Sequence, residues 1–254
     1  MIHRISSCRC GRTALFQKSL LGLDHLLEYI PAGSANDFAV NTGISQNPLS
    51  ALEQILCCAE PTRYDVGYMT YDDAPDPAER HYFTSSCGIG YDAEVSRVAM
   101  VSTSTSKNLL NKLGMGDLIF LLDAIKTLAG VKRGDCTMTL DDDRVVSIPQ
   151  FLFVCSMIYR YEGGGFLFSP DADPCDGKLD VCSFGYMPKW KVLLAFPAGY
   201  KGTHYRFQNV EPYRAGKVHI HTSMPFWVQL DGEVATQSAD ISIYCDQKRL
   251  RLLK

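Results

Sequence analysis

The stretch "PFWVQLDGEVA", residues 225–235, shows the local pattern that decides the fold. Its aromatic and β-branched residues are typical of a strand, and Asp231-Gly232 is a dipeptide that favours a two-residue hairpin turn. A turn is the first interpretation of these residues. A carboxylate fixed beside such a turn could also act as a general base, and Glu233 is the candidate.

Strand-like segments of the same kind recur through the second half of the chain. They are short, β-branched or aromatic, and separated by turn residues: "CTMTLDDDR", "QFLFVCSMI", "KLDVCSFG", "KVHIHT", "PFWVQLDGE" and "ISIYCD". This repetition predicts an antiparallel sandwich or barrel. Leucines at helical spacing within residues 106–130 predict a helical insertion in it.

The first part of the chain has a different pattern. The segment "EYIPAG" predicts a strand that runs into a glycine loop, and "NPLSALEQILCC" predicts a helix with Asn47 or Ser50 as its cap and Leu49, Leu52, Ile55 and Leu56 on one face. Residues 1–19 predict neither helix nor strand.

The predicted fold class is therefore α+β, with the domain boundary near residues 71–76. An α/β domain occupies residues 1–73, and residues 246–254 return to it. A β-sandwich domain with the helical insertion occupies residues 74–245.

Composition excludes several classes of protein. The 254 residues include 25 basic and 28 acidic side chains, well interleaved, and the formal net charge of -3 gives no electrostatic footprint for nucleic acid. The ten cysteines lie mostly in apolar runs, which favours a reducing cytoplasm. The longest apolar run, "LIFLL", is far shorter than the roughly 20 residues that a membrane-spanning helix needs.

Two loops carry residues suited to phosphate or metal chemistry. In "PAGSAND", Gly33 allows close approach of a ligand to the backbone, Ser34 offers a hydroxyl, and Asn36 and Asp37 could bind ribose, phosphate or metal. The sequence is neither a P-loop nor a dinucleotide fingerprint, and the alternative is an ordinary loop in which Asn36 or Asp37 caps the next helix.

The second loop, "GGGFLFSPDADPCDGKLDV", follows three consecutive glycines and carries Asp171, Asp173, Asp176 and Asp180. Its spacing does not fit an EF-hand, because Asp176 stands where that motif requires glycine. A looser magnesium site and a solvated turn both remain open. Another stretch, "CGIGYDAEVSRVA", places Asp92 and Glu94 at the start of a helix, where capping alone explains them.

Taken together, "IPAGSANDFA", "CGIGYDAEVSRVA", "GGGFLFSPDADPCDGKLDV" and "VQLDGE" stand in the same order as the signatures of the soluble bacterial diacylglycerol kinase family. The chain resembles that family over residues 20–254. The resemblance implies a nucleotide-binding α/β domain, a β-sandwich domain and an active site in the cleft between them. It also implies transfer of the ATP γ-phosphoryl group, with Mg²⁺, to a lipid hydroxyl such as that of diacylglycerol, giving phosphatidic acid.

The resemblance assigns roles to individual residues. Gly33, Ser34, Asn36 and Asp37 match the stretch beside the phosphates, Glu233 matches the base for the lipid hydroxyl, and Asp231 matches its supporting carboxylate. Asp176 and Asp180 match a loop that holds a second, largely structural magnesium.

The resemblance also implies a peripheral association with membranes. Five cations of the helical region and its end could bring the cleft to an anionic membrane surface: Lys107, Lys112, Lys126, Lys132 and Arg133. A homodimer stays open as a further expectation.

The sequence departs from the family in two places. No Gly-Gly-Asp-Gly-Thr motif precedes "IPAGSAND", and Val40 stands where the family usually has arginine. We expect a fragment or a mis-started reading frame of a lipid kinase, with little activity as written. The alternative is a natural short homologue that binds lipid without phosphorylating it. The first is favoured because the short form would expose the edge of a half-built parallel sheet.

Overall fold

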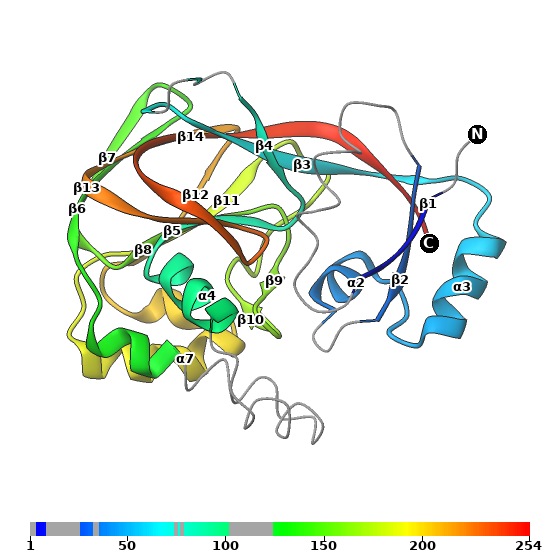
Figure 1. Cartoon of the computed structure of the whole chain (residues 1–254), viewed down its shortest axis with the longest axis horizontal. Helices are drawn as coiled ribbons and strands as arrows, with labels where there is room; N and C mark the ends of the chain where they lie inside the picture. The colour runs from blue at the N-terminus through cyan, green and yellow to red at the C-terminus, as the bar shows by residue number, and fades with distance from the viewer. Residues whose placement is uncertain (1–3, 9–25, 33–35, 74–75, 77–78, 102–123) are drawn as a thin grey trace.

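One twelve-stranded sheet runs through the computed structural model, which describes residues 4–8, 26–32, 36–73, 76, 79–101 and 124–254 (Figure 1). Its strands are β1 (Arg4–Cys8), β2 (Leu26–Pro31), β3 (Thr62–Tyr71), β4 (His81–Phe83), β5 (Ser86–Gly90), β6 (Gly134–Leu140), β7 (Arg144–Phe151), β8 (Phe153–Met157), β11 (Leu179–Phe184), β12 (Val210–Ala215), β13 (Lys217–Leu230) and β14 (Glu233–Leu253). The main path through the sheet is β1-β2-β14-β13-β5-β8-β11-β12. The predicted mixed class with a strand-rich β-sandwich is confirmed.

Short elements complete the fold. A separate hairpin joins β9 (Tyr161–Glu162) to β10 (Phe166–Leu167). The helices are α2 (Asp37–Thr42), α3 (Pro48–Cys57), α4 (Tyr91–Val101) and α7 (Lys189–Tyr200), followed by the 3-10 turn η1 (His204–Arg206). In Figure 1, α2 and α3 lie at the end of the molecule that carries both chain termini, while α4 and α7 lie against the sandwich.

One long strand, β14, connects the N-terminal strands to the sandwich. The predicted strands "KVHIHT" and "PFWVQLDGE" are one continuous strand, β13, whose pairing with β14 is interrupted by bulges after His221 and after Trp227. β14 pairs with β13 at its start and with β2, in parallel, through Arg251–Leu253 at its end. The division into domains stays a prediction, because this sheet is continuous across the proposed boundary.

The N-terminal portion differs from its prediction in two respects. β1 exists within residues 1–19, where no strand was expected, and it pairs in parallel with β2. α3 is capped by Asn47, whose Oδ1 accepts the N–H groups of Leu49 at 2.9 Å and Ser50 at 3.3 Å. Its buried face carries Ala51 and Ile55, while Leu49 and Leu56 are exposed, so the predicted leucine face is wrong in part. This helix lies against β2.

Helices cover one face of the sandwich strands. An apolar cluster contains Tyr91 of α4, Val192 of α7 and Leu128 of the short helical segment 124–129. These side chains pack with Phe153 of β8 and Phe184 of β11. Residues 124–129 are helical, and the rest of the predicted insertion lies outside the described residues. α7 was not predicted, and it continues through Pro197, a residue type that disfavours a helix interior.

Candidate active site

The hairpin turn between β13 and β14 is fixed by its backbone. Asp231 has φ 50° and Gly232 has φ 81°, and two positive φ angles in succession define the tight hairpin turn that asparagine, aspartate and glycine favour. The Gly232 N–H donates to Gln229 Oε1 at 2.6 Å, and the Asp231 N–H donates to the Ser86 carbonyl at 3.0 Å. The turn is therefore anchored to the start of β5.

The Asp231 carboxylate is fully engaged with the segment before β5. Its Oδ1 accepts the N–H groups of Ser85 at 2.7 Å and Ser86 at 3.0 Å. Its Oδ2 accepts both the N–H and the hydroxyl of Thr84, each at 2.9 Å. Burial raises the pKa of Asp231, and these hydrogen bonds oppose the shift. This carboxylate holds the strand end in place and has little freedom to act on a substrate.

Gln229 connects the turn to further carboxylates. It is fully buried, and its Nε2 donates to Asp92 Oδ2 at 2.9 Å, to Ser86 Oγ at 3.2 Å and to Glu162 Oε1 at 3.4 Å. Gly88 makes this arrangement possible, because a Cβ there would lie 2.1 Å from Asp92 Oδ2. The Asp92 side chain thus has a role beyond the capping that the sequence indicated.

Glu162 lies at the centre of this network. The Ser86 hydroxyl donates a short hydrogen bond to its Oε1. Burial raises the pKa of Glu162 well above its ordinary value, and the charges of Asp92, Asp231 and Asp37 raise it further against the opposing hydrogen bond from Ser86. Burial also raises the pKa of Asp92 to about 6. A crowded set of buried carboxyl groups of this kind favours the approach of a cation.

Asp37, at the end of the "PAGSAND" loop, lies near Glu162. The Gly164 N–H, within the glycine run, donates to Asp37 Oδ2 at 3.0 Å. Asn41 of α2 binds Tyr161 of β9 twice, through Nδ2 to the Tyr161 carbonyl at 2.8 Å and through Oδ1 to its N–H at 3.1 Å. Segments more than a hundred residues apart in the chain are therefore joined beside Glu162.

The remaining residues predicted for the nucleotide loop have different positions. Asn36 holds the N-cap position of α2 in a left-handed conformation, and its side chain makes no capping hydrogen bond, so a side-chain cap is wrong for this residue. Gly33 and Ser34 lie outside the described residues. Val40 is exposed on α2.

Glu233, the predicted base, is the first residue of β14 and lies opposite Leu230 in the hairpin. It is half-buried and follows the fixed turn directly. Its position is thus set by a rigid element, as a general base requires. The catalytic roles of Glu233, Asp231 and Asp37 stay predictions.

The predicted metal loop forms a separate structure. Asp176 makes an ion pair with Arg214 of β12 and accepts the Lys178 N–H at 2.9 Å. Asp180 Oδ2 lies 3.9 Å from Arg214 Nε, and burial raises the pKa of Asp180 to about 6. Arg214 therefore already offers positive charge to both carboxylates, and their role in binding magnesium stays a prediction.

The sequence did not single out Glu162 or Gln229, and it explained Asp92 by capping alone. The sequence features that could have pointed to them are their positions. Glu162 directly precedes the glycine run, and Gln229 precedes the Asp-Gly-Glu turn by two residues. Neither position identifies a partner across the fold. Gln229 lies on β13, Glu162 on β9 and Asp92 on α4, so only the tertiary fold brings these side chains together.

Comparison with known proteins defines the class. Residues 85–253 match the family model described as the YegS C-terminal NAD kinase beta sandwich-like domain, and the chain belongs to this family. The match includes Ser86, Glu162, Gln229 and Asp231.

Individual relatives carry kinase names. A diacylglycerol kinase of Mycobacterium tuberculosis is 26% identical over 204 residues, which cover 79% of this chain and 60% of that protein. A protein of Alcanivorax borkumensis named "Probable lipid kinase YegS-like" is 28% identical over 234 residues, covering 89% and 69%. The chain thus spans 60% of the length of the first of these relatives.

The fold agrees with these comparisons. A crystal structure of a diacylglycerol kinase from Bacillus anthracis matches with a TM-score of 0.66 at 17% identity, covering 98% of this chain and 75% of that one. At this level of identity the likeness concerns the fold.

Proposed function

We propose that this chain carries the catalytic carboxylates of an ATP-dependent lipid kinase. The reaction is transfer of the γ-phosphoryl group to a lipid hydroxyl, such as that of diacylglycerol, giving phosphatidic acid. One observation carries the proposal: hydrogen bonds join Glu162 to the end of β13 through Ser86 and Gln229, and join the neighbouring glycine run to Asp37. The kinase names of the relatives support the reaction class.

The donor set fits Mg²⁺ with bound nucleotide. Magnesium in kinases is held by one or two carboxylates together with the substrate phosphates. Asp37 and Glu162 supply such oxygens, and Asn36 is a polar neighbour for the phosphates. When bound, the ion neutralises charge on the transferred phosphoryl group. Its approach would lower the raised pKa of Glu162, because opposite charge favours the ionised carboxylate.

Glu233 and Asp231 have different tasks in this proposal. Glu233 takes the proton of the lipid hydroxyl, while Asp231 fixes the turn that presents it. Positioning of this kind matters in phosphoryl transfer, since a displacement of about 1 Å can cost roughly a hundredfold in rate.

A surface around α7 has side chains suited to binding a membrane. We name it the α7 surface; its apolar members are Tyr186, Trp190, Leu193 and Leu194, and its cations are Lys126, Lys132, Arg133, Lys189 and Lys191. Trp190 is 61% exposed and Leu194 is 57% exposed. No acidic residue occurs from position 185 to 210. Aromatic and apolar side chains among cations fit the headgroup region of an anionic bilayer.

Hydrogen bonds unite the two parts of the α7 surface. Lys189 Nζ donates to the Ala129 carbonyl at 2.6 Å, and Arg133 Nη2 donates to the Met187 carbonyl at 2.7 Å. The cations predicted at the end of the helical insertion therefore lie beside the start of α7, while Lys107 and Lys112 lie outside the described residues. Each cation near an anionic surface contributes about 1 kcal/mol. None of the helices within the described residues is long and apolar enough to cross a bilayer.

The competing proposal is a lipid-binding module without kinase activity, which the α7 surface supports equally. The sequence contains no Gly-Gly-Asp-Gly-Thr stretch, so we expect the 254 residues alone to transfer phosphate slowly. The test uses a chimera that joins this chain to the part of the Mycobacterium tuberculosis relative that the match does not cover. Transfer of labelled phosphate from ATP to diacylglycerol in mixed micelles by the folded chimera supports a kinase. A folded chimera that binds vesicles and ATP without transfer supports the binding module.

A further inference from the structure

Three adjacent strands carry a cluster of metal-ligating side chains away from the candidate active site. His219 and His221 are two residues apart and therefore lie on the same face of β13. They pair with Ser242 and Asp240 of β14, respectively. Asp72 directly follows β3, the next strand beyond β14. About ten residues of strand, or roughly 30 Å at the usual rise, separate His221 from the turn at Asp231.

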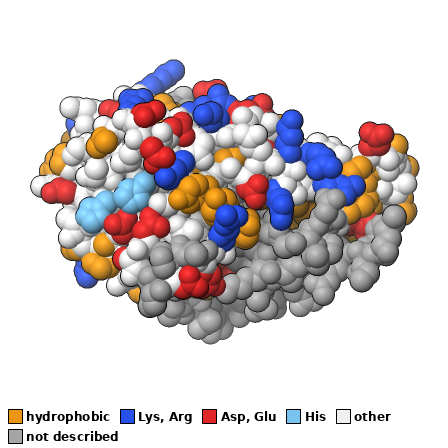
Figure 2. Space-filling model, turned by 90° about the horizontal axis from the view of Figure 1, so that it is seen from above, with side chains coloured by type: hydrophobic (Ala, Val, Ile, Leu, Met, Phe, Trp, Pro, Cys, Tyr) orange, Lys and Arg blue, Asp and Glu red, His pale blue; other side chains and the backbone are white. Residues whose placement is uncertain are grey.

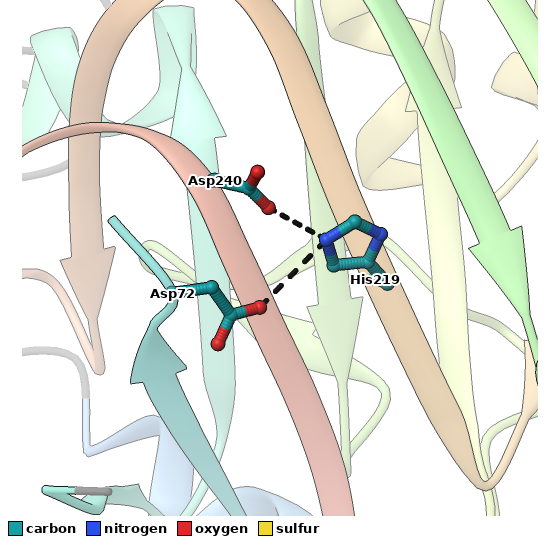
Figure 3. A group of neighbouring side chains, drawn as sticks. All are labelled: Asp72, His219 and Asp240. Carbon is teal, nitrogen blue, oxygen red and sulfur yellow. Dashed lines mark hydrogen bonds and ion pairs between the residues drawn. The ribbon is translucent and has the colours of Figure 1, made fainter. Parts of the chain in front are cut away.

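The imidazole of His219 points at both carboxylates (Figure 3). Its Nε2 lies 2.6 Å from Asp240 Oδ1 and 3.7 Å from Asp72 Oδ2. One ligand atom from each of these three residues lies within 4.8 Å of the other two. The second carboxylate oxygen, Asp240 Oδ2, lies 3.1 Å from His221 Nδ1. The described part of the chain thus brings one imidazole nitrogen and two carboxylates together, with a second imidazole on the far oxygen of Asp240.

Neighbouring hydroxyl groups hold Asp72 in position. Thr70 Oγ1 donates to Asp72 Oδ1 at 2.9 Å, and Ser242 Oγ donates to Asp72 Oδ2 at 2.5 Å. The Asp72 N–H also donates to the Asp240 carbonyl at 2.9 Å. Hydrogen bonds from a surrounding shell are what orient carboxylate ligands at metal sites.

We propose that His219, Asp240 and Asp72 bind a divalent transition metal ion of the zinc class. Imidazole and carboxylate together suit such an ion, whereas calcium and magnesium prefer oxygen alone. Zinc lies about 2.0–2.2 Å from nitrogen and oxygen ligands, so tetrahedral ligand atoms are roughly 3.3 Å apart. The observed 2.6 Å and 3.7 Å bracket that separation, and all three ligand atoms lie within 4.8 Å of one another.

Access and charge agree with this site. The side chains of His219, Asp72 and Asp240 are 30–35% exposed, so an ion can reach them from solvent. Figure 2 shows histidine side chains next to acidic side chains at the surface of this view of the molecule. The nearest lysine of β13, Lys217, is bound to Asp142 at 2.7 Å. The two carboxylates balance the charge of the ion.

The test is a calorimetric titration of the chelator-treated chain with zinc, compared with His219→Gln and Asp240→Asn. We expect one zinc site per wild-type chain and at least about a tenfold loss of affinity in each variant, the scale for disturbed metal sites. Asp143→Asn is the matched control, because Asp143 is an exposed carboxylate in the turn between β6 and β7. It should bind zinc as the wild type does. Circular dichroism confirms that each variant is folded.

Cysteines are the competing zinc ligands, since Cys57 and Cys175 are exposed. Cobalt separates the two cases, because thiolate ligation gives intense near-ultraviolet absorption that imidazole and carboxylate do not. Saturable binding lost with His219→Gln, without the thiolate band, supports the proposal. Wild-type chain that binds no zinc, or variants that bind zinc as tightly as wild type, would overturn it and leave a surface ion-pair cluster.

Discussion

Replacement of Asp231 by asparagine tests the structural role of the hairpin turn. Asparagine tolerates the left-handed backbone at this position, so Asp231→Asn changes the hydrogen bonds without straining the turn. The four donors are the N–H groups of Thr84, Ser85 and Ser86 and the Thr84 hydroxyl. The variant removes the charge and turns one accepting oxygen into a donor.

The hydrogen bonds allow the loss in free energy of unfolding to be worked out for both orientations of the asparagine amide in Asp231→Asn. If the NH₂ group replaces Oδ1, two backbone N–H groups lose their acceptor. If it replaces Oδ2, the Thr84 hydroxyl can turn to accept, but the Thr84 N–H cannot. At least one buried N–H is left unpaired, and a hydrogen bond to a charged group contributes about 1.5–3 kcal/mol. Relief of the buried charge offsets part of this loss. We expect the free energy of unfolding to fall by about 2 kcal/mol.

The assay is urea unfolding at neutral pH followed by circular dichroism, with Asp143→Asn as the exposed control. The control should change the free energy of unfolding by less than about 0.5 kcal/mol. An Asp231→Asn variant that matches this control, with an unchanged urea dependence, would refute the proposed anchoring of the turn.

The remaining predictions concern a buried acid, the metal loop and the α7 surface. Because the folded-state pKa of Asp92 is raised from 3.8 to about 6, wild-type stability from this group falls as pH rises through that window. Asp92→Asn should therefore gain roughly 1 kcal/mol relative to wild type between pH 5 and pH 7.5, and an equal difference at both pH values would contradict the shift. Magnesium should raise the melting temperature of wild type more than that of Asp176→Ala, and equal rises would remove Asp176 from a metal site. Trp190→Ser and Leu194→Ser should weaken binding to anionic vesicles by roughly tenfold each, as loss of one to two kcal/mol of apolar burial requires; unchanged binding, with Leu49→Ser as the exposed control on α3, would exclude the α7 surface.

Local patterns were sufficient to predict many elements. Alternating and β-branched residues correctly indicated antiparallel strands in the second half. Asn47 was predicted as a cap and binds two N–H groups of α3. These features depend on neighbours in the sequence, which is why the sequence indicates them.

Features set by tertiary pairing could not be predicted in the same way. The leucine face assigned to α3 was wrong in part, because the helix buries Ala51 and Ile55 while Leu49 and Leu56 are exposed. β1 has no strong strand pattern and forms through parallel pairing with β2. α7 keeps a helical backbone through Pro197, since packing of its buried side chains outweighs the lost hydrogen bond.

The candidate site shows the same limit. Asp231 and Glu233 were found from their motif, yet Gln229 and Glu162 lie on strands of two separate sheets that meet only in the tertiary fold. Asp92 was explained as a helix cap, although its Oδ2 accepts from Gln229. Sequence reasoning identified the turn and missed the network behind it, because that network consists of contacts between distant segments.

The most direct test of the proposed function compares the chimera with its Glu233→Gln variant. The measurement is the rate of labelled phosphate transfer from ATP to diacylglycerol in mixed micelles, with Glu53→Gln on the exposed face of α3 as the matched control. We predict transfer by the chimera and by the control, and at least about a hundredfold slower transfer by Glu233→Gln at an unchanged melting temperature. Transfer at the parent rate by Glu233→Gln would contradict the assignment of the base. A folded, ATP-binding chimera that phosphorylates no lipid would contradict the proposal that this chain carries the site of a lipid kinase.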